Sequence, residues 1–299
     1  MENIYTLWSD ENRQYHSPTQ FLPLVPLTFL AIAMRCIIQT FLIKPMGIYL
    51  GIPPDLPAYP SVLLEKTSKP SKLTRFTTSC KKLIWYSFIW TFGVAVLWNK
   101  PWLWDINASW TDFGNDPVTI DLFLYGNLTV LYYSSELLSQ LFLDVRRKDF
   151  WIMFIHHITA IAVVAIIWIF KLHRIGSLAP LLHDVNDIIV ELSKCLKCLK
   201  YPKWPEIFFE FFAISWVITR LIILPFWYIR ACLEDSQGAL SQASVYYVWN
   251  GLFLVLMFLH CIWTVMIFKV IRMIIQSGSA VDIRSRSESC SEEESDKDD

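Results

Sequence analysis

The sequence predicts an all-α protein, a polytopic membrane helix bundle of about seven spans. Hydrophobic residues make up 54% of the 299 residues and charged residues only 18%, whereas soluble domains carry about 25% charged residues. The apolar residues are gathered into runs of about 20, the length that an α-helix needs to cross the hydrocarbon core of a bilayer. An ordinary soluble domain is excluded, because one core could not bury this much apolar surface.

Seven apolar segments are candidate spans. The second is short, and the fifth is interrupted by polar residues between His183 and Glu191, so hydropathy alone is a weak indicator there. An odd number of spans places the two termini on opposite sides of the membrane. The segments are Phe21–Ile43, Leu83–Trp98, Pro117–Leu143, Phe150–Phe170, Ile175–Cys195, Ile207–Ile229 and Val245–Ile271.

The lysines and arginines of the connecting segments predict the orientation. Sixteen lie on one side of the membrane and five on the other. Since cytosolic loops carry the excess of basic residues, the N-terminus is expected in the lumen and the C-terminus in the cytosol. The first 20 residues lack the layout of a cleaved signal peptide, so the first span is expected to stay as an anchor. Asn107-Ala108-Ser109 is then a glycosylation sequon on the luminal side.

Composition divides the chain into four parts. Residues 1–43 are the luminal N-terminus and the first span, and residues 44–79 are a Pro- and Lys-rich cytosolic loop that is expected to be irregular. Residues 80–275 hold the other spans and form the expected catalytic domain. Residues 276–299 are rich in Ser, Glu and Asp and are expected to be a disordered cytosolic tail, whose serines are candidate phosphorylation sites.

Ionisable residues inside spans are costly, so each is a candidate functional residue. His156 and His157 lie in the fourth predicted span, and His183, Asp184 and Asp187 lie in the fifth. At 1.5 Å per residue, His156 lies roughly 9 Å and Asp187 roughly 12 Å from the cytosolic ends of their helices. Because the two spans are antiparallel and joined by a short turn, we expect them to be neighbours. A pairing of an Asp with a His across them is possible, and which pair forms is left open.

Several chemistries fit such clusters. Polar residues can simply hold helices together by hydrogen bonds. A metal site is disfavoured, because the chain has only six His and these clusters do not match a known zinc spacing, so we expect no metal. Acid–base or acyl-transfer chemistry needs an imidazole that a carboxylate can orient. No Ser or Cys stands out as a nucleophile, so a His can itself carry the acyl group. The basic residues form no block interleaved with aromatics, so nucleic acid is not expected as a partner.

A longer set of motifs carries a family resemblance. Asp144-Val145-Arg146-Arg147-Lys148-Asp149-Phe150-Trp151, His156-His157, Gly176-Ser177-Leu178 and His183-Asp184-Val185-Asn186-Asp187 occur in this order. Together they resemble the Lag1 motif of the ceramide synthases, within the TRAM–Lag1–CLN8 (TLC) domain. Pro101-Trp102-Leu103-Trp104, Thr219-Arg220-Leu221 and Pro225-Phe226-Trp227 match as well. The resemblance covers residues from about 80 to 275 and implies a six-helix TLC-type core preceded by an N-terminal span.

The resemblance implies transfer of a fatty acyl group from acyl-CoA, as co-substrate, to the amine of a sphingoid base at the endoplasmic reticulum, with no further cofactor. It also implies a homodimer or a heterodimer with related synthases, in contact with membrane lipids. The implied catalytic residues are His156, His157, His183, Asp184 and Asp187, and the implied substrate-binding residues are Arg146, Arg147, Lys148, Asp149 and Arg220.

The basic run 146–148 is equally typical of a topology signal. The homeobox-like domain of many animal relatives is absent between the first two spans, since residues 44–82 are too few for it. The alternative function is a non-catalytic TLC-domain lipid carrier, sensor or translocation-associated protein. A channel or transporter is disfavoured, because we find no internal repeat.

Overall fold

The structure is a computed structural model that describes residues 22–54, 71–111, 118–143, 149–239 and 243–277. All the regular secondary structure of these residues is helical, as predicted. Long helical segments occupy each of the seven predicted positions. They are α1 (Leu24–Ile38) continued by η2 (Gln39–Ile43) and α2 (Lys44–Tyr49), α3 (Lys72–Leu97), α5 (Ile120–Phe142), α6 (Phe150–Ile169), α7 (His173–Cys198), α8 (Trp204–Trp216) continued by η5 (Val217–Ile229) and α9 (Arg230–Ala239), and α10 (Ala243–Ser277).

Within the described residues, five of these segments are long and apolar enough to cross a membrane. The two that fall short are α5 and α7. The reason is their polar content, since α5 carries Asp121 and Glu136 and α7 carries the polar residues between His183 and Lys194. The protein is therefore a multi-pass membrane protein with five helices that qualify by hydropathy, and the polar helices α5 and α7 are the ones that carry much of the candidate chemistry.

The loop expected at residues 44–79 is partly helical. Lys44–Tyr49 forms α2, and α3 begins at Lys72, eleven residues before the predicted start of the second span. Ser71 explains the early start, because its side chain accepts a hydrogen bond from the Thr74 backbone N–H and caps the helix. Residues 55–70 of the loop and the predicted tail at 278–299 lie outside the described residues.

Two stretches of π-helix accompany prolines. The turn η2 immediately precedes Pro45, and η5 contains Pro225. A proline has no N–H for the carbonyl four residues earlier, and its ring crowds that carbonyl, so a widened turn relieves both problems. The helix η5, which contacts α7, is therefore wider than an α-helix, and the side chains of η5 point in directions that differ from those of a regular α-helix.

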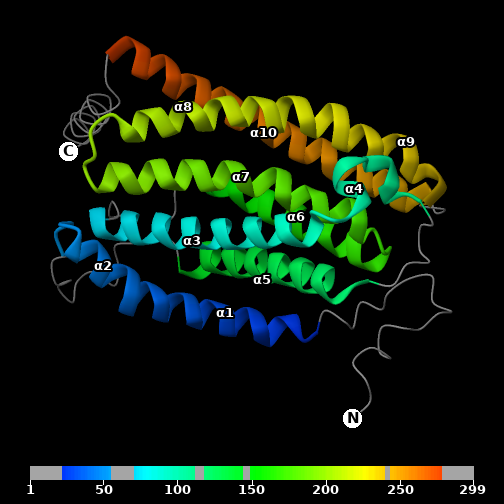
Figure 1. Ribbon diagram of the computed structural model, residues 1–299, viewed down its shortest axis with the longest axis horizontal. Helices are drawn as coiled ribbons and strands as arrows, with labels where there is room; N and C mark the ends of the chain where they lie inside the picture. The colour runs from blue at the N-terminus through cyan, green and yellow to red at the C-terminus, as the bar shows by residue number, and fades with distance from the viewer. Residues whose placement is uncertain (1–21, 55–70, 112–117, 144–148, 240–242, 278–299) are drawn as a thin grey trace, which may run out of the picture. The chain divides into compact units, whose positions relative to one another are not determined.

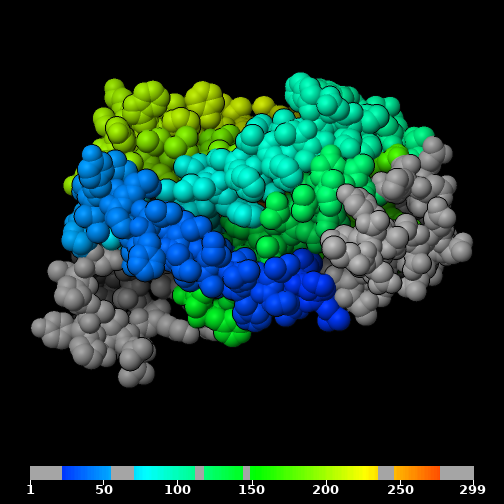
Figure 2. All heavy atoms as spheres, turned by 60° about the horizontal axis from the view of Figure 1, so that its bottom comes forward, coloured from blue at the N-terminus to red at the C-terminus, as the bar shows by residue number. Residues whose placement is uncertain are grey.

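The helix α7 is central among the described elements. It packs against α3 and α8 and also contacts α5, α6 and η5, and Figure 1 shows it between α3 and α8. At the opposite side, α1 lies against α5 and forms an outer face of the molecule (Figure 2). That face exposes large apolar side chains such as Phe29 and Phe41, the latter 71% exposed, as expected of a surface in contact with lipid.

The contact pattern divides the chain into two units, residues 1–256 and 257–299. The short helices α4 (Pro101–Trp104) and η4 (Ile106–Ser109) belong to the first unit and cover the N-terminal end of α7. Trp102 Nε1 donates to Ser177 Oγ at 3.3 Å, and Arg174 Nη1 donates to the Ala108 and Thr111 carbonyls. The candidate site described below lies entirely within this first unit.

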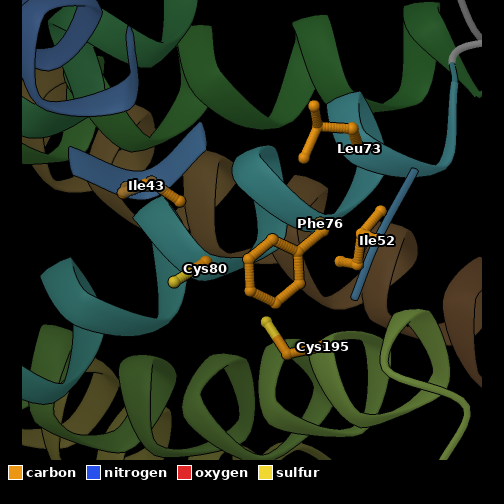
Figure 3. Packing of buried hydrophobic residues seen from close by; sticks show 6 residues of the cluster. All are labelled: Ile43, Ile52, Leu73, Phe76, Cys80 and Cys195. Carbon is orange, nitrogen blue, oxygen red and sulfur yellow. The ribbon is translucent and has the colours of Figure 1, made fainter. Parts of the chain in front are cut away.

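The α2 end of the first unit has a buried apolar cluster. Phe76 lies at its centre, among Ile43, Ile52, Leu73, Cys80 and Cys195 (Figure 3). Gly47 of α2 makes this packing possible, because a Cβ there would lie 2.9 Å from Cδ1 of Phe76. The cluster joins α2, α3 and the C-terminal part of α7 by apolar burial.

An ion-pair triad ties α1 to α3 and α5. Arg35 pairs with Glu136, whose other carboxylate oxygen lies 3.0 Å from Lys82 Nζ. Arg35 also donates to Ser135 Oγ at 2.7 Å. The Glu136 side chain is only 4% exposed, so its charge is stabilised by these two cations rather than by water.

Candidate active site

Two histidines from different helices line one cavity. His156 of α6 and His183 of α7 both face one space, which we call the histidine cavity. Tyr133 of α5 is a third polar residue beside them. The rest of the lining is mainly apolar and comes from α6, α7, η5 and the first part of α10, and includes Ala160, Val163, Ile167, Leu224, Phe253 and Leu256.

The histidine cavity extends along α6 and α7 from the two imidazoles. Ile167 and Gly176 line it as well, and Ile167 lies eleven residues beyond His156 on α6. At 1.5 Å per residue that separation is roughly 16 Å. The cavity thus combines two imidazoles with an elongated apolar space, which suits a hydrocarbon chain with a reactive group at one end.

The tautomer of His183 is defined by its own helix. Its Nδ1 lies 2.7 Å from the Ala179 carbonyl oxygen, one turn earlier on α7. A carbonyl only accepts hydrogen bonds, so Nδ1 carries the proton, and Nε2 of the neutral ring keeps its lone pair. An imidazole held in this way can accept a proton or attack a carbonyl carbon through Nε2.

The two aspartates of α7 have different surroundings. Asp184 is 2% exposed, and Tyr133 Oη donates to its Oδ1 at 3.2 Å. Asp187, one turn further, lies among the charges of Lys82, Glu136 and Lys194. Asp184 therefore belongs with Tyr133 at the centre of the bundle, whereas Asp187 faces the charged groups nearer the C-terminal end of α7.

The helix η5 fixes α7 beside the cavity. Arg220 Nη2 donates to the His183 carbonyl at 2.9 Å, and the Asn186 side chain donates to Thr219 Oγ1 at 2.6 Å. Arg220 is 4% exposed, and its guanidinium lies 5.3 Å from the centre of the Trp216 ring. One buried cation thus fixes the backbone of α7 at His183.

The other predicted site residues are placed as follows. His157 is 7% exposed, and its ring centre lies 5.6 Å from that of His156. It turns away from the histidine cavity, since among the described residues His156 lines the space and His157 does not. Asp149 precedes α6 and is partly exposed. Arg146, Arg147 and Lys148 lie outside the described residues.

Tyr133 was not predicted from the sequence. A signal existed, because Tyr133, Glu136 and Gln140 follow the helical spacing of i, i+3 and i+7 and so share one face of a predicted span. Thr219 was noted only as part of a motif, and its bond to Asn186 joins residues 33 apart. Among the described residues, no three His, Cys, Asp or Glu side chains converge in a way that could hold a metal ion.

Comparisons with known proteins identify the family of this chain. Residues 75–269 match the family model of the TLC domain (TRAM_LAG1_CLN8). Human ceramide synthase 5 is 30% identical over 94% of this chain and 81% of its own length. The Caenorhabditis elegans ceramide synthase hyl-1 is 32% identical over 68% of this chain and 58% of its own length. Arabidopsis thaliana ceramide synthase LOH2 is 27% identical over 85% of this chain and 87% of its own length.

In some relatives the match covers less of the other protein, such as 53% of mouse ceramide synthase 5 and 57% of human ceramide synthase 3. The names of these relatives favour an acyltransferase over the non-catalytic carrier or sensor that was the alternative. Because the TLC domain matches residues 75–269, more than half of the chain, and human ceramide synthase 5 is 30% identical over 94% of it, this chain belongs to the TLC-domain family and, within it, to the ceramide synthases.

Proposed function

We propose that this protein transfers a fatty acyl group from acyl-CoA to the amine of a sphingoid base, such as sphinganine or sphingosine, and so forms a ceramide or dihydroceramide. The observation that carries the proposal is the convergence of His156 and His183 on one elongated apolar cavity. The ceramide synthase names of the relatives supply the substrate class.

Acyl transfer suits this cavity because its polar groups are few and specific. Among the described lining residues there is no Ser or Cys, so the candidate nucleophiles and bases are the two imidazoles. The apolar walls hold the acyl chain and exclude water, which would otherwise hydrolyse an activated acyl group.

The steps assign a role to each group. His156 attacks the thioester carbon of acyl-CoA, a carbon–nitrogen bond forms, and the carbon–sulfur bond breaks to release the CoA thiolate. The neutral amine of the sphingoid base then attacks the same carbon and gives its proton to Nε2 of His183. The amide forms, His156 is released, and the proton passes from His183 to the thiolate.

The surrounding residues position these groups. Tyr133 and Asp184 hold α5 and α7 together at the level of the histidines, and Arg220 holds the His183 segment through its carbonyl. The basic run 146–148 and Asp149 lie at the predicted cytosolic mouth, where Arg and Lys can bind the phosphates of CoA. Arg220 is buried against the His183 carbonyl, which is the contact through which it acts on the site.

The cellular setting follows from the same proposal. The protein resides in the endoplasmic reticulum membrane with a luminal N-terminus and a cytosolic C-terminus, as the basic loops indicate. It forms a homodimer or a heterodimer with related synthases.

An acyltransferase assay on purified protein tests the proposal. Sphinganine is supplied with a panel of acyl-CoAs, and the double variant His156→Ala/His157→Ala is assayed in parallel. We expect N-acyl product from the wild type and none from a folded double variant. A folded wild type that makes no product with any acyl-CoA would contradict the proposal, and full activity of the double variant would contradict the site.

A further inference from the structure

A second cavity lies on the other side of the contact between α6 and α7. It lies between α5, α6 and α7, and we call it the α5 cavity. Nothing in the proposed chemistry uses it so far. Its own lining residues, not shared with the histidine cavity, include Leu122, Gly126 and Thr129 of α5, Trp168 of α6, and His173 and Ser177 of α7.

The two cavities share a wall. Val164 and Ile167 of α6 and Gly176 and Pro180 of α7 line both spaces. The wall is thin, because α6 and α7 approach closely there: a Cβ on Gly176 would lie 2.6 Å from Cγ2 of Ile167. The α5 cavity and the histidine cavity therefore run side by side along the same stretch of α6 and α7.

Both cavities begin near the level of the candidate catalytic groups. Thr129 lies one turn before Tyr133 on α5, and Pro180 lies three residues before His183 on α7. From there both extend toward the α6–α7 turn, the end of the bundle that is predicted to be luminal. Two chains that are joined at the level of Tyr133 and His183 could thus lie in separate spaces with their ends at the same side.

The surface of the α5 cavity suits a hydrocarbon chain better than a polar head group. Two of the hydroxyl groups of its lining residues are engaged within the protein, since Thr129 Oγ1 donates to the Tyr125 carbonyl at 2.9 Å and Ser177 Oγ donates to the Arg174 carbonyl at 2.6 Å. The hydroxyl of Tyr125, which also lines the cavity, packs against Gly93 of α3. His173 packs its ring against Trp168, with ring centres 4.6 Å apart. An apolar chain can fill such a space without breaking the hydrogen bonds of Thr129 and Ser177.

We propose that the α5 cavity binds the alkyl chain of the long-chain amine, while the histidine cavity binds the acyl chain. The inference rests on the proposed function. An acylated long-chain amine has two hydrocarbon chains joined at one amide, so it requires two apolar spaces that start at the same point. The acyl chain continues from the imidazole to which its carbonyl is attached, and this leaves the neighbouring cavity for the amine. Ile167 and Gly176 keep the two chains apart.

Two matched substitutions test the assignment. Thr129→Leu fills the α5 cavity alone, and Ala160→Leu fills the histidine cavity alone. Each purified variant is assayed with a long and a short saturated 2-amino-1,3-diol base at saturating acyl-CoA, and with a long and a short acyl-CoA at saturating base. The measured quantity is the ratio of kcat/KM for the long and the short substrate.

Thr129→Leu is expected to lower the long-to-short ratio for the base by about tenfold, the effect of removing space for a few methylene groups, and to leave the ratio for acyl-CoA unchanged. Ala160→Leu is expected to do the reverse. If Thr129→Leu shifts the acyl-CoA ratio instead, the α5 cavity extends the acyl site and the proposal is wrong. If it shifts neither ratio, no substrate chain enters the α5 cavity, and the proposal is wrong as well.

The substrate whose ratio is unchanged serves as the folding control within each variant. Should Thr129→Leu be inactive with every substrate, Gly126→Ala replaces it, because the added Cβ would lie 3.3 Å from Trp168 and requires only a small adjustment. An inactive wild type would contradict the proposed function itself. An active wild type with no shift of the base ratio in either α5-cavity variant would contradict only the assignment of the cavity.

Discussion

The triad of Arg35, Glu136 and Lys82 predicts a strong effect of neutralising its one carboxylate. Glu136→Gln removes the partner of two cations whose side chains are only 15% and 23% exposed. At an effective dielectric constant of about 20, two unit charges 3.0 Å apart, the separation of Lys82 and Glu136, attract by about 5.5 kcal/mol. Part of this offsets the desolvation of the carboxylate, so the net cost of leaving the cations without it is about 3–5 kcal/mol.

Thermal unfolding in detergent measures this cost. A loss of this size lowers the midpoint by about 10 °C for a chain of this length. Glu234→Gln is the matched control, because it removes the same charge from an ion pair with Arg230 in which both side chains are more than half exposed, and it should cost less than about 1 kcal/mol. Equal midpoints for the Glu136→Gln and Glu234→Gln variants would refute the claim that the triad holds α1 on α3 and α5.

Two further predictions concern the centre of the bundle. Tyr133→Phe removes the hydrogen bond to the buried Asp184 side chain. Because leaving a buried polar group without its partner costs about 1–3 kcal/mol, we expect kcat for sphinganine acylation to fall by at least about fivefold, and an unchanged kcat would show that this bond is not needed. Gly93→Ala places a Cβ 2.7 Å from Tyr125 Oη, and this overpacking should destabilise the fold by about 1–3 kcal/mol. Gly251→Ala is the control, because its Cβ would meet nothing within 4 Å. Equal thermal midpoints for the two variants would contradict the close packing of α3 and α5.

Hydrophobic periodicity and length predict the fold class well for this chain. The seven apolar segments coincide with long helical segments, even for α7, whose polar residues prevent it from qualifying by hydropathy. The boundaries were less predictable. The start of α3 depends on the cap at Ser71 rather than on apolar content. The long π-helical stretch η5 has no periodic signature in the sequence, and only Pro225 indicates a departure from a regular α-helix there.

The composition of the candidate site was also visible in the sequence, whereas its contacts were not. The depths of His156 and Asp187 in antiparallel neighbouring spans indicated that the two polar clusters would come together, and His156 and His183, one residue from each cluster, line one cavity. Their partners depend on how each helix is rotated about its axis, which spacing alone does not define. The sequence leaves open which Asp pairs with which His, and it gives no sign of the hydrogen bonds from Tyr133 to Asp184 and from His183 to the Ala179 carbonyl. The pairing of Arg35 with Glu136 joins residues 101 apart.

The measurement that tests the central claim most directly is the turnover of a His183→Asn variant with sphinganine and acyl-CoA, with product amide quantified by mass spectrometry. The Asn amide can replace the Nδ1–H that donates to the Ala179 carbonyl, and it lacks the Nε2 lone pair. If His183 accepts the amine proton in the histidine cavity, kcat should fall by about 100-fold or more while the thermal midpoint stays close to that of the wild type. Wild-type turnover in this variant would contradict the account, because the amine proton would then have another acceptor.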